Sequence, residues 1–168
     1  MSTNLQFISS VTVSGGSSTV SLDNVFSTNY DVYKLVVTDF VPASSENLAF
    51  RLLDSSGSAL TGSDYDVATL ILRSNASFGE VRVTGTTMWT YGGYVTSSHT
   101  QGFGLEMDIF NPFNASYTFA NLNSNSSTAD MGNKNIYVYK QATSTRGLQL
   151  SAVGGNLKNI KASIYGVK

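Results

Sequence analysis

Apolar and polar side chains alternate through most of this chain, and this period of two restricts it to folds built from strands. The clearest case has Leu105, Met107 and Ile109 on one face of a strand and Glu106 and Asp108 on the other. An amphipathic helix would instead repeat its apolar residues near every 3.6 positions, and no segment shows that repeat. We therefore predict an all-β protein of antiparallel sheets.

About ten short strands are expected, separated by turns rich in Gly, Asp, Asn and Ser. The sets predicted to point into the core are Tyr33, Leu35 and Val37; Leu48, Phe50 and Leu52; Leu105, Met107 and Ile109; Tyr117 and Phe119; Ile136 and Val138; and Ile160, Ala162 and Ile164. Two packed sheets in a jelly-roll-like β-sandwich would bury one face of each strand, and a closed small barrel is the alternative.

The chain shows no internal repeat and no linker, so residues 1–168 are expected to form a single β-sandwich domain. Residues 1–14 are expected to be either an extended N-terminal arm or an edge strand, since Gly15 and Gly16 would let them swing free. The N-terminus has no basic flank followed by an apolar run, and no stretch approaches about 18 apolar residues. We expect synthesis in the cytoplasm and no membrane insertion.

Charged residues make up only 12% of the chain, its net charge is −1, and it contains no cysteine and one histidine. Nucleic-acid binding depends on clustered Lys and Arg, which are scattered here, so no nucleic-acid partner is predicted. The absence of cysteine excludes disulfides and thiolate metal sites. A surface of hydroxyls and amides must either form hydrogen bonds with water or be covered by neighbouring proteins. The sequence therefore directs attention to residues that could form protein or ligand contacts.

Two arrangements would suit catalysis, but each has a plainer interpretation that we favour. His99 follows Ser98 as the single imidazole, yet no glycine pattern typical of a nucleophile elbow accompanies it, so it is expected to be an exposed loop residue. Glu106 and Asp108 point the same way, as a glycosidase pair would, but any alternating strand places its outer charges like this. No catalytic residue and no cofactor is predicted.

One acidic segment contains Asp54, Asp64 and Asp66 among serines and glycines, and Ca²⁺ takes its oxygen ligands from such loops. The spacing does not match an EF-hand, and turns closed by the Asp side chains explain the same residues without an ion. We favour the turns and leave calcium open.

Aromatic residues gather in the longest stretch without clean alternation, residues 85–102, and continue on one later strand. Flat rings with polar rims suit both sugar stacking and protein contacts, although strand tyrosines also fill structure. The candidate contact surface consists of Trp89, Tyr91, Tyr94 and His99, joined by Tyr137 and Tyr139 on the face opposite Ile136 and Val138.

Three segments, residues 22–37 (LDNVFSTNYDVYKLVV), 48–58 (LAFRLLDSSGS) and 163–168 (SIYGVK), resemble small accessory virion proteins of tailed, particularly marine, bacteriophages. The resemblance implies a β-sandwich module that is made in the host cytoplasm, released by lysis and displayed on the virion. Such modules resemble capsid decoration (cement) proteins, head fibres or tail-fibre tips. The resemblance implies no catalytic residues in this chain.

Our leading hypothesis is a non-enzymatic capsid decoration protein that binds the capsid lattice and itself, as a homo-oligomer with a trimer favoured. The alternative is a tail-fibre or head-fibre module that binds a host receptor or glycan through the aromatic loop around Trp89. A hydrolase is the remaining possibility, with Glu106 and His99 as its test positions.

Overall fold

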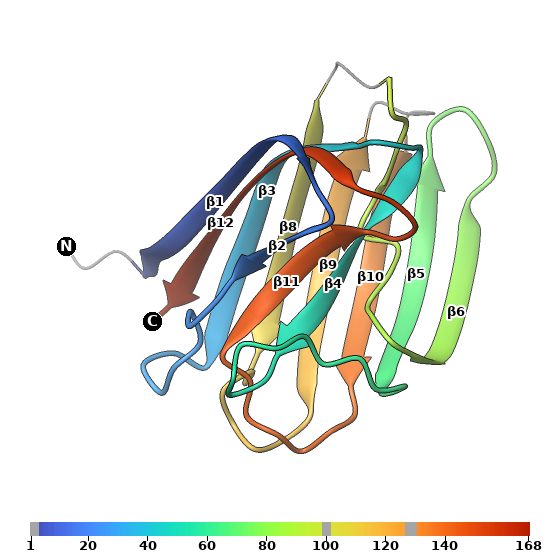
Figure 1. Cartoon of the computed structure of the whole chain (residues 1–168). Helices are drawn as coiled ribbons and strands as arrows, with labels where there is room; N and C mark the ends of the chain where they lie inside the picture. Colours follow the sequence, from blue (N-terminus) through green and yellow to red (C-terminus); the bar gives the residue numbers. More distant parts are fainter. Residues whose placement is uncertain (1–3, 99–101, 127–130) are drawn as a thin grey trace.

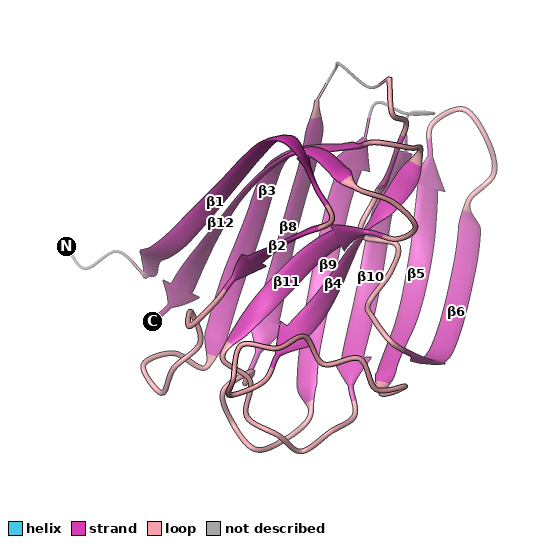
Figure 2. Cartoon of the chain, viewed as in Figure 1, coloured by secondary structure: helices cyan, strands magenta, loops and turns pink. Residues whose placement is uncertain are grey.

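The computed structural model describes residues 4–98, 102–126 and 131–168, which form twelve strands in two antiparallel sheets and no helix (Figures 1 and 2). The eight-stranded sheet contains, in spatial order, β1 (Leu5–Ser17), β12 (Leu157–Val167), β3 (Val32–Pro42), β8 (Phe103–Phe110), β9 (Thr118–Ser126), β10 (Met131–Tyr139), β5 (Tyr65–Arg73) and β6 (Gly79–Thr86). The four-stranded sheet contains β2 (Thr19–Leu22), β11 (Gly147–Ala152), β4 (Glu46–Leu53) and β7 (Tyr94–Val95). The predicted antiparallel β-sandwich is confirmed.

Eight of these strands have jelly-roll connectivity, because successive strands alternate between the sheets, apart from the neighbours β4 and β7, and early strands pair with late ones. In the large sheet β1, β12, β3 and β8 are neighbours, and β2, β11, β4 and β7 form the small sheet. The other four strands are two inserted hairpins, β5–β6 between β4 and β7, and β9–β10 between β8 and β11. Both hairpins extend the large sheet on the side of β8, so it reaches well beyond the small sheet (Figure 1).

The core lies between the two sheets and uses most of the predicted apolar sets. The sets beginning at Tyr33, Leu48, Leu105 and Ile160 are buried as expected. The segment between β6 and β7 covers the part of the large sheet that the small sheet does not reach, and Trp89 in this segment forms an isolated bridge with Phe50 of β4. The described residues include no helix that could span a membrane.

Two predicted core sets are wrong, because they lie on the outer face of the large sheet. Phe119 of β9 is 45% exposed, and Ile136 of β10 is 60% exposed. The inner positions of these strands are instead Thr118, Ala120 and Leu122 in β9, and Asn133, Asn135, Tyr137 and Tyr139 in β10. Period two identifies the two faces of a strand but does not say which is inside when both carry apolar residues.

The N-terminal residues are an edge strand, one of the two predicted alternatives. Strand β1 pairs along β12 from Leu5 to Ser17, with irregularities in register, so residues 5–14 do not form a free arm. Gly15 and Gly16 have φ values of 96° and 97°, a region that favours glycine. They lie where the chain leaves the large sheet for β2 of the small sheet.

Candidate contact surface

Trp89 is a core residue, which corrects its prediction as a contact residue. Its side chain is fully buried, and its indole N–H donates a hydrogen bond of 3.0 Å to the carbonyl oxygen of Val138. The indole stacks on the Tyr137 ring with centroids 5.2 Å apart, and it meets the Tyr65 ring edge-on at 5.6 Å. Trp89 therefore anchors its connecting segment to the sheet, the filling role that the sequence left open.

Tyr137 and Tyr139 are also buried, so they too are wrong as contact residues. The Tyr137 hydroxyl donates to the carbonyl oxygen of Thr90 at 2.8 Å and accepts a hydrogen bond from the Asn135 amide. Burial raises the pKa of the Tyr137 phenol and also that of the Tyr139 phenol. Both rings belong to the aromatic cluster of the core, since Tyr139 packs on Tyr65 at 4.7 Å.

Tyr91 and Tyr94 are half-buried, and His99 lies outside the described residues. Tyr91 has a φ of 61°, and its carbonyl oxygen accepts hydrogen bonds from the side-chain amides of Asn133 (2.9 Å) and Asn135 (2.7 Å). Its backbone is thus fastened to the inner face of β10. The aromatic residues predicted as one exposed group are divided between core and half-buried positions.

The three aspartates of the calcium hypothesis each have separate partners. Asp54 accepts hydrogen bonds from the Ser56 hydroxyl and from the backbone N–H groups of Ser56 and Ser58, which hold the pKa of this carboxyl below its usual range. Asp64 accepts from Gln141 at 2.7 Å, and Asp66 pairs with Lys140 at 2.9 Å. No group of three or more His, Cys, Asp or Glu side chains suited to a metal occurs among the described residues.

Glu106 and Asp108 project from the outer face of β8, as the plainer interpretation predicted. Lys34 on the neighbouring strand β3 contacts both, with its Nζ 3.3 Å from Glu106 and 2.9 Å from Asp108. Partial burial lowers the pKa of Lys34, but the two carboxylates outweigh this and leave it raised. The shared lysine offsets one of the two negative charges at the sheet surface.

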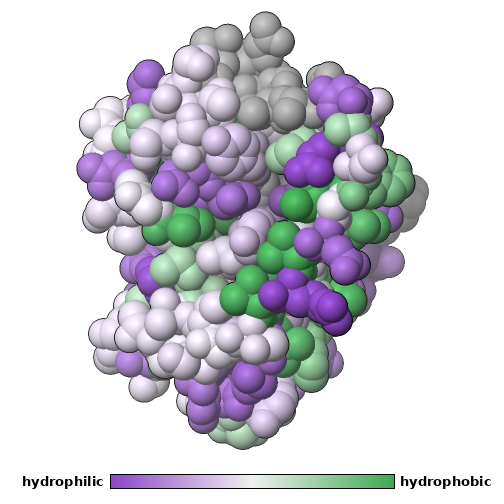
Figure 3. All heavy atoms as spheres, turned by 90° about the vertical axis from the view of Figure 1, so that its right-hand side faces the viewer, coloured by the Kyte–Doolittle hydropathy of each residue, from purple (hydrophilic) through white to green (hydrophobic). Residues whose placement is uncertain are grey.

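Exposed apolar side chains concentrate on the outer face of the large sheet, a feature that sequence reasoning missed. Of the eight large hydrophobic residues exposed in the described chain, five lie on this face: Leu5 and Phe7 of β1, Phe119 of β9, Ile136 of β10 and Leu70 of β5. Two more, Phe78 and Tyr117, directly precede β6 and β9, whereas Val153 lies between β11 and β12. A hydrophobic band is visible at the β6 end of the molecule (Figure 3).

The strand register aligns these side chains in rows across the sheet. One row joins Asn121, Ile136, Ala68 and Arg82, which are direct neighbours on β9, β10, β5 and β6. The next row joins Asn123, Lys134, Leu70 and Glu80 on the same strands. The eight strands contain 8 to 13 residues each. At about 3.3 Å per residue and about 4.8 Å between strands they give a face of roughly 1,200 Å².

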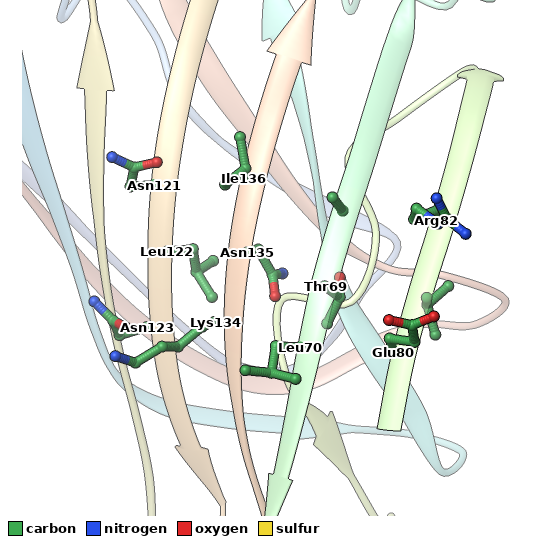
Figure 4. Close-up of a pocket in the computed structure, with 12 residues that line it drawn as sticks. Thr69, Leu70, Glu80, Arg82, Asn121, Leu122, Asn123, Lys134, Asn135 and Ile136 are labelled. Atoms are coloured by element: carbon green, nitrogen blue, oxygen red, sulfur yellow. The ribbon is translucent and has the colours of Figure 1, made fainter. Parts of the chain in front are cut away.

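A hollow of about 490 Å³ in this face is lined by Ala68 and Leu70 of β5 and by residues of β9, β10 and β6. Figure 4 shows Leu70 and Ile136 among the side chains that line it. Ala68 is small, and its cross-strand neighbours Ile136 and Arg82 are long, so their side chains leave a depression over its methyl group. A second hollow of about 180 Å³ shares these three residues and continues toward Asp66. Together they form a groove along β5, which we call the β5 groove.

The comparisons with known proteins leave the function of this chain open. No protein-family model and no curated protein matches it. Among solved structures it is similar to an exo-inulinase from Aspergillus awamori, at 13% sequence identity and a TM-score of 0.44. That match covers 96% of this chain and 29% of the exo-inulinase chain.

Proposed function

We propose that this chain is a non-enzymatic structural protein of a phage virion, a capsid decoration protein that binds the capsid lattice through the outer face of its large sheet. The observation that carries the proposal is the gathering of exposed apolar residues on that one face. Monomeric proteins rarely expose large contiguous apolar patches, and those that occur mark contact sites.

The dimensions of the face suit a stable protein contact. A standard interface covers about 800 Å² on each partner, and the face of roughly 1,200 Å² formed by the eight strands is large enough to hold it. The apolar side chains of Ile136 and Leu70 are interspersed with the amides of Asn121 and Asn123, a mixture typical of protein interfaces.

The virion setting is supported by the resemblance of residues 22–37, 48–58 and 163–168 to accessory virion proteins. A jelly roll is also one of the sandwich folds used by viral capsid proteins. In this setting the protein is made in the host cytoplasm, and repetition of one contact over a shell stabilises the particle without any chemistry.

The test measures binding of the purified chain to phage shells that lack it, by co-sedimentation. We expect the double variant Ile136→Lys/Leu70→Lys to bind at least tenfold more weakly than wild type, because both charges would be desolvated in the contact. Val153→Lys is the matched control, since Val153 is exposed but lies off the face, and it should bind like wild type. Equal binding by the double variant, or cryo-microscopy showing the chain only at tail tips, contradicts the proposal.

The β5 groove favours a second candidate function, a tail-fibre or head-fibre module that binds a glycan. Arg82, Glu80 and Lys134 offer hydrogen-bonding groups beside the apolar floor of Ala68 and Leu70, and none of the three forms an ion pair within the described residues. This location replaces the aromatic loop of the sequence hypothesis. Binding on a glycan array that Ala68→Trp abolishes, while shell binding persists, would support it, and array binding that survives Ala68→Trp would exclude the groove.

A further inference from the structure

Strand β6 is an open edge of the large sheet. It pairs with β5 on one side, and no described strand lies on the other (Figure 1). Beyond the ladder with β5, residues 79–84 make no backbone hydrogen bond among the described parts of the chain. An edge of this kind presents unpaired N–H and C=O groups that accept a further strand.

Proteins usually protect long edge strands with proline, lysine, other charges or β-bulges. In β6 the one register irregularity lies near its end, opposite Tyr65 and Val67, so residues 79–83 pair regularly with β5 and form an uninterrupted edge. The two edges of the small sheet are short, with four residues in β2 and two in β7, whereas β6 has eight. Strand β6 contains neither proline nor lysine, two residues that commonly block edge pairing. Its charged residues are Glu80 and Arg82, of opposite sign and two positions apart on the outer face.

Symmetry limits how two copies of β6 can pair. Antiparallel strands related by a two-fold axis place one residue opposite its own copy, and the residues before and after it opposite each other. An axis at Glu80 would oppose two glutamates, and an axis at Arg82 would oppose two arginines. An axis at Val81 places Glu80 of each copy opposite Arg82 of the other, giving two complementary cross-strand pairs.

The Val81 register also covers the exposed aromatic residue at this edge. Phe78, directly before β6, is 66% exposed. In this register it lies opposite Thr84 of the second copy and diagonal to Arg82 of that copy, within reach of a long side chain. Both ionic partners and the aromatic ring then gain contacts that the single chain does not provide.

We propose that two copies of this chain pair edge to edge through β6, antiparallel and centred on Val81, to form one continuous sheet of sixteen strands. The outer faces of both copies then lie on the same side, which doubles the face available for contacts. The inference rests on the edge of the sheet and not on its face, so it stands independently of the proposed function. It gives a two-fold pair where the sequence analysis favoured a trimer.

The test uses single cysteines, which is possible because the chain contains none of its own. Opposed residues in an antiparallel pair have Cα atoms about 4.5–5.5 Å apart, within disulfide range. Val81→Cys should therefore form a disulfide-linked dimer on mild oxidation. Val83→Cys is the matched control on the same strand and face, because its own copy would be roughly 13 Å away along the strand, and it should stay monomeric on a non-reducing gel.

Charge exchange tests the register in a second way, by sedimentation equilibrium of the full chain. Glu80→Arg and Arg82→Glu should each weaken dimerisation at least fivefold, because each sets like charges opposite each other, and the double exchange should restore it. A monomer or a trimer at all concentrations, equal crosslinking of the Val83→Cys control, or a double exchange that is no better than the single ones overturns the proposal.

Discussion

Replacing Trp89 with alanine should cost a large part of the stability of this protein. The side chain is fully buried, stacks on Tyr137 and donates a hydrogen bond to the Val138 carbonyl. Truncating a buried tryptophan costs about 3–5 kcal/mol in lost burial and cavity formation. The lost hydrogen bond adds about 1 kcal/mol. For a chain of this length each kcal/mol shifts Tm by about 2–4 °C, so Tm should fall by roughly 8–24 °C.

Thermal unfolding of Trp89→Ala followed by far-UV circular dichroism measures this loss. The matched control is Phe119→Ala, because Phe119 is 45% exposed on the outer face and should lose less than about 1 kcal/mol. Trp89 is the only tryptophan, so native wild-type emission should be blue-shifted and protected from acrylamide. A Trp89→Ala variant as stable as Phe119→Ala, with exposed tryptophan emission in the wild type, would refute the burial of Trp89 and restore the aromatic contact loop.

Three further predictions test the core. Burial raises the folded-state pKa of Tyr137, so the stability that this neutral phenol contributes is present below a pH of about 10 and is lost as the pH rises above it. The urea midpoint of the wild type should therefore fall more steeply above a pH of about 10 than the urea midpoint of Tyr137→Phe. Equal slopes for the two proteins would contradict this. The Thr69 hydroxyl is buried without a hydrogen-bond partner, so Thr69→Val should match or exceed wild-type Tm, and a loss above about 1 kcal/mol would show an unseen partner. A Cβ at Gly147 would lie 2.3 Å from the Leu22 carbonyl oxygen, whereas a Cβ at Gly104 would meet nothing within 4 Å. Gly147→Ala should therefore lower the free energy of unfolding by about 1–3 kcal/mol in chemical denaturation. A loss no larger than that of the control Gly104→Ala would show that the backbone around Gly147 relaxes.

The sequence predicts the architecture because burial is one-sided in most strands. In β8 the apolar side chains of Leu105, Met107 and Ile109 alternate with charges, so only one face can be inside, and the structure buries that face. The same logic holds for β3 and β12. Connectivity is beyond such reasoning, since pairings such as β1 with β12 join residues far apart in the chain.

The errors fall where both faces of a strand carry apolar residues. In β10 the alternatives were Ile136 with Val138 or Tyr137 with Tyr139, and the buried set is the one that contacts Trp89. Only the tertiary neighbour decides this. The outer set stays apolar although it gains no core contact, and such inconsistency between local pattern and fold is expected at functional surfaces.

The sequence assigns Trp89 to a contact surface, with a filling role left open, because its segment is rich in glycine and lacks alternation. Such segments usually lie on the surface. Here the inserted hairpins extend the large sheet beyond the small one. The segment that contains Trp89 covers the inner face of this extension, where the indole packs on Tyr137 of β10. Three of the predicted site residues, Trp89, Tyr137 and Tyr139, therefore belong to the core, whereas Phe119 and Ile136, which were predicted to be core residues, are exposed on the outer face of the large sheet.

Hydroxyl-radical footprinting of the chain, free and on intact particles, tests the central claim most directly, because it measures side-chain exposure residue by residue. If the outer face of the large sheet is the contact surface, Phe119, Ile136 and Leu70 should be oxidised in the free chain and protected on the particle, while Val153 stays equally reactive in both. Protection of Val153 with unchanged reactivity of Phe119, Ile136 and Leu70 would contradict the account.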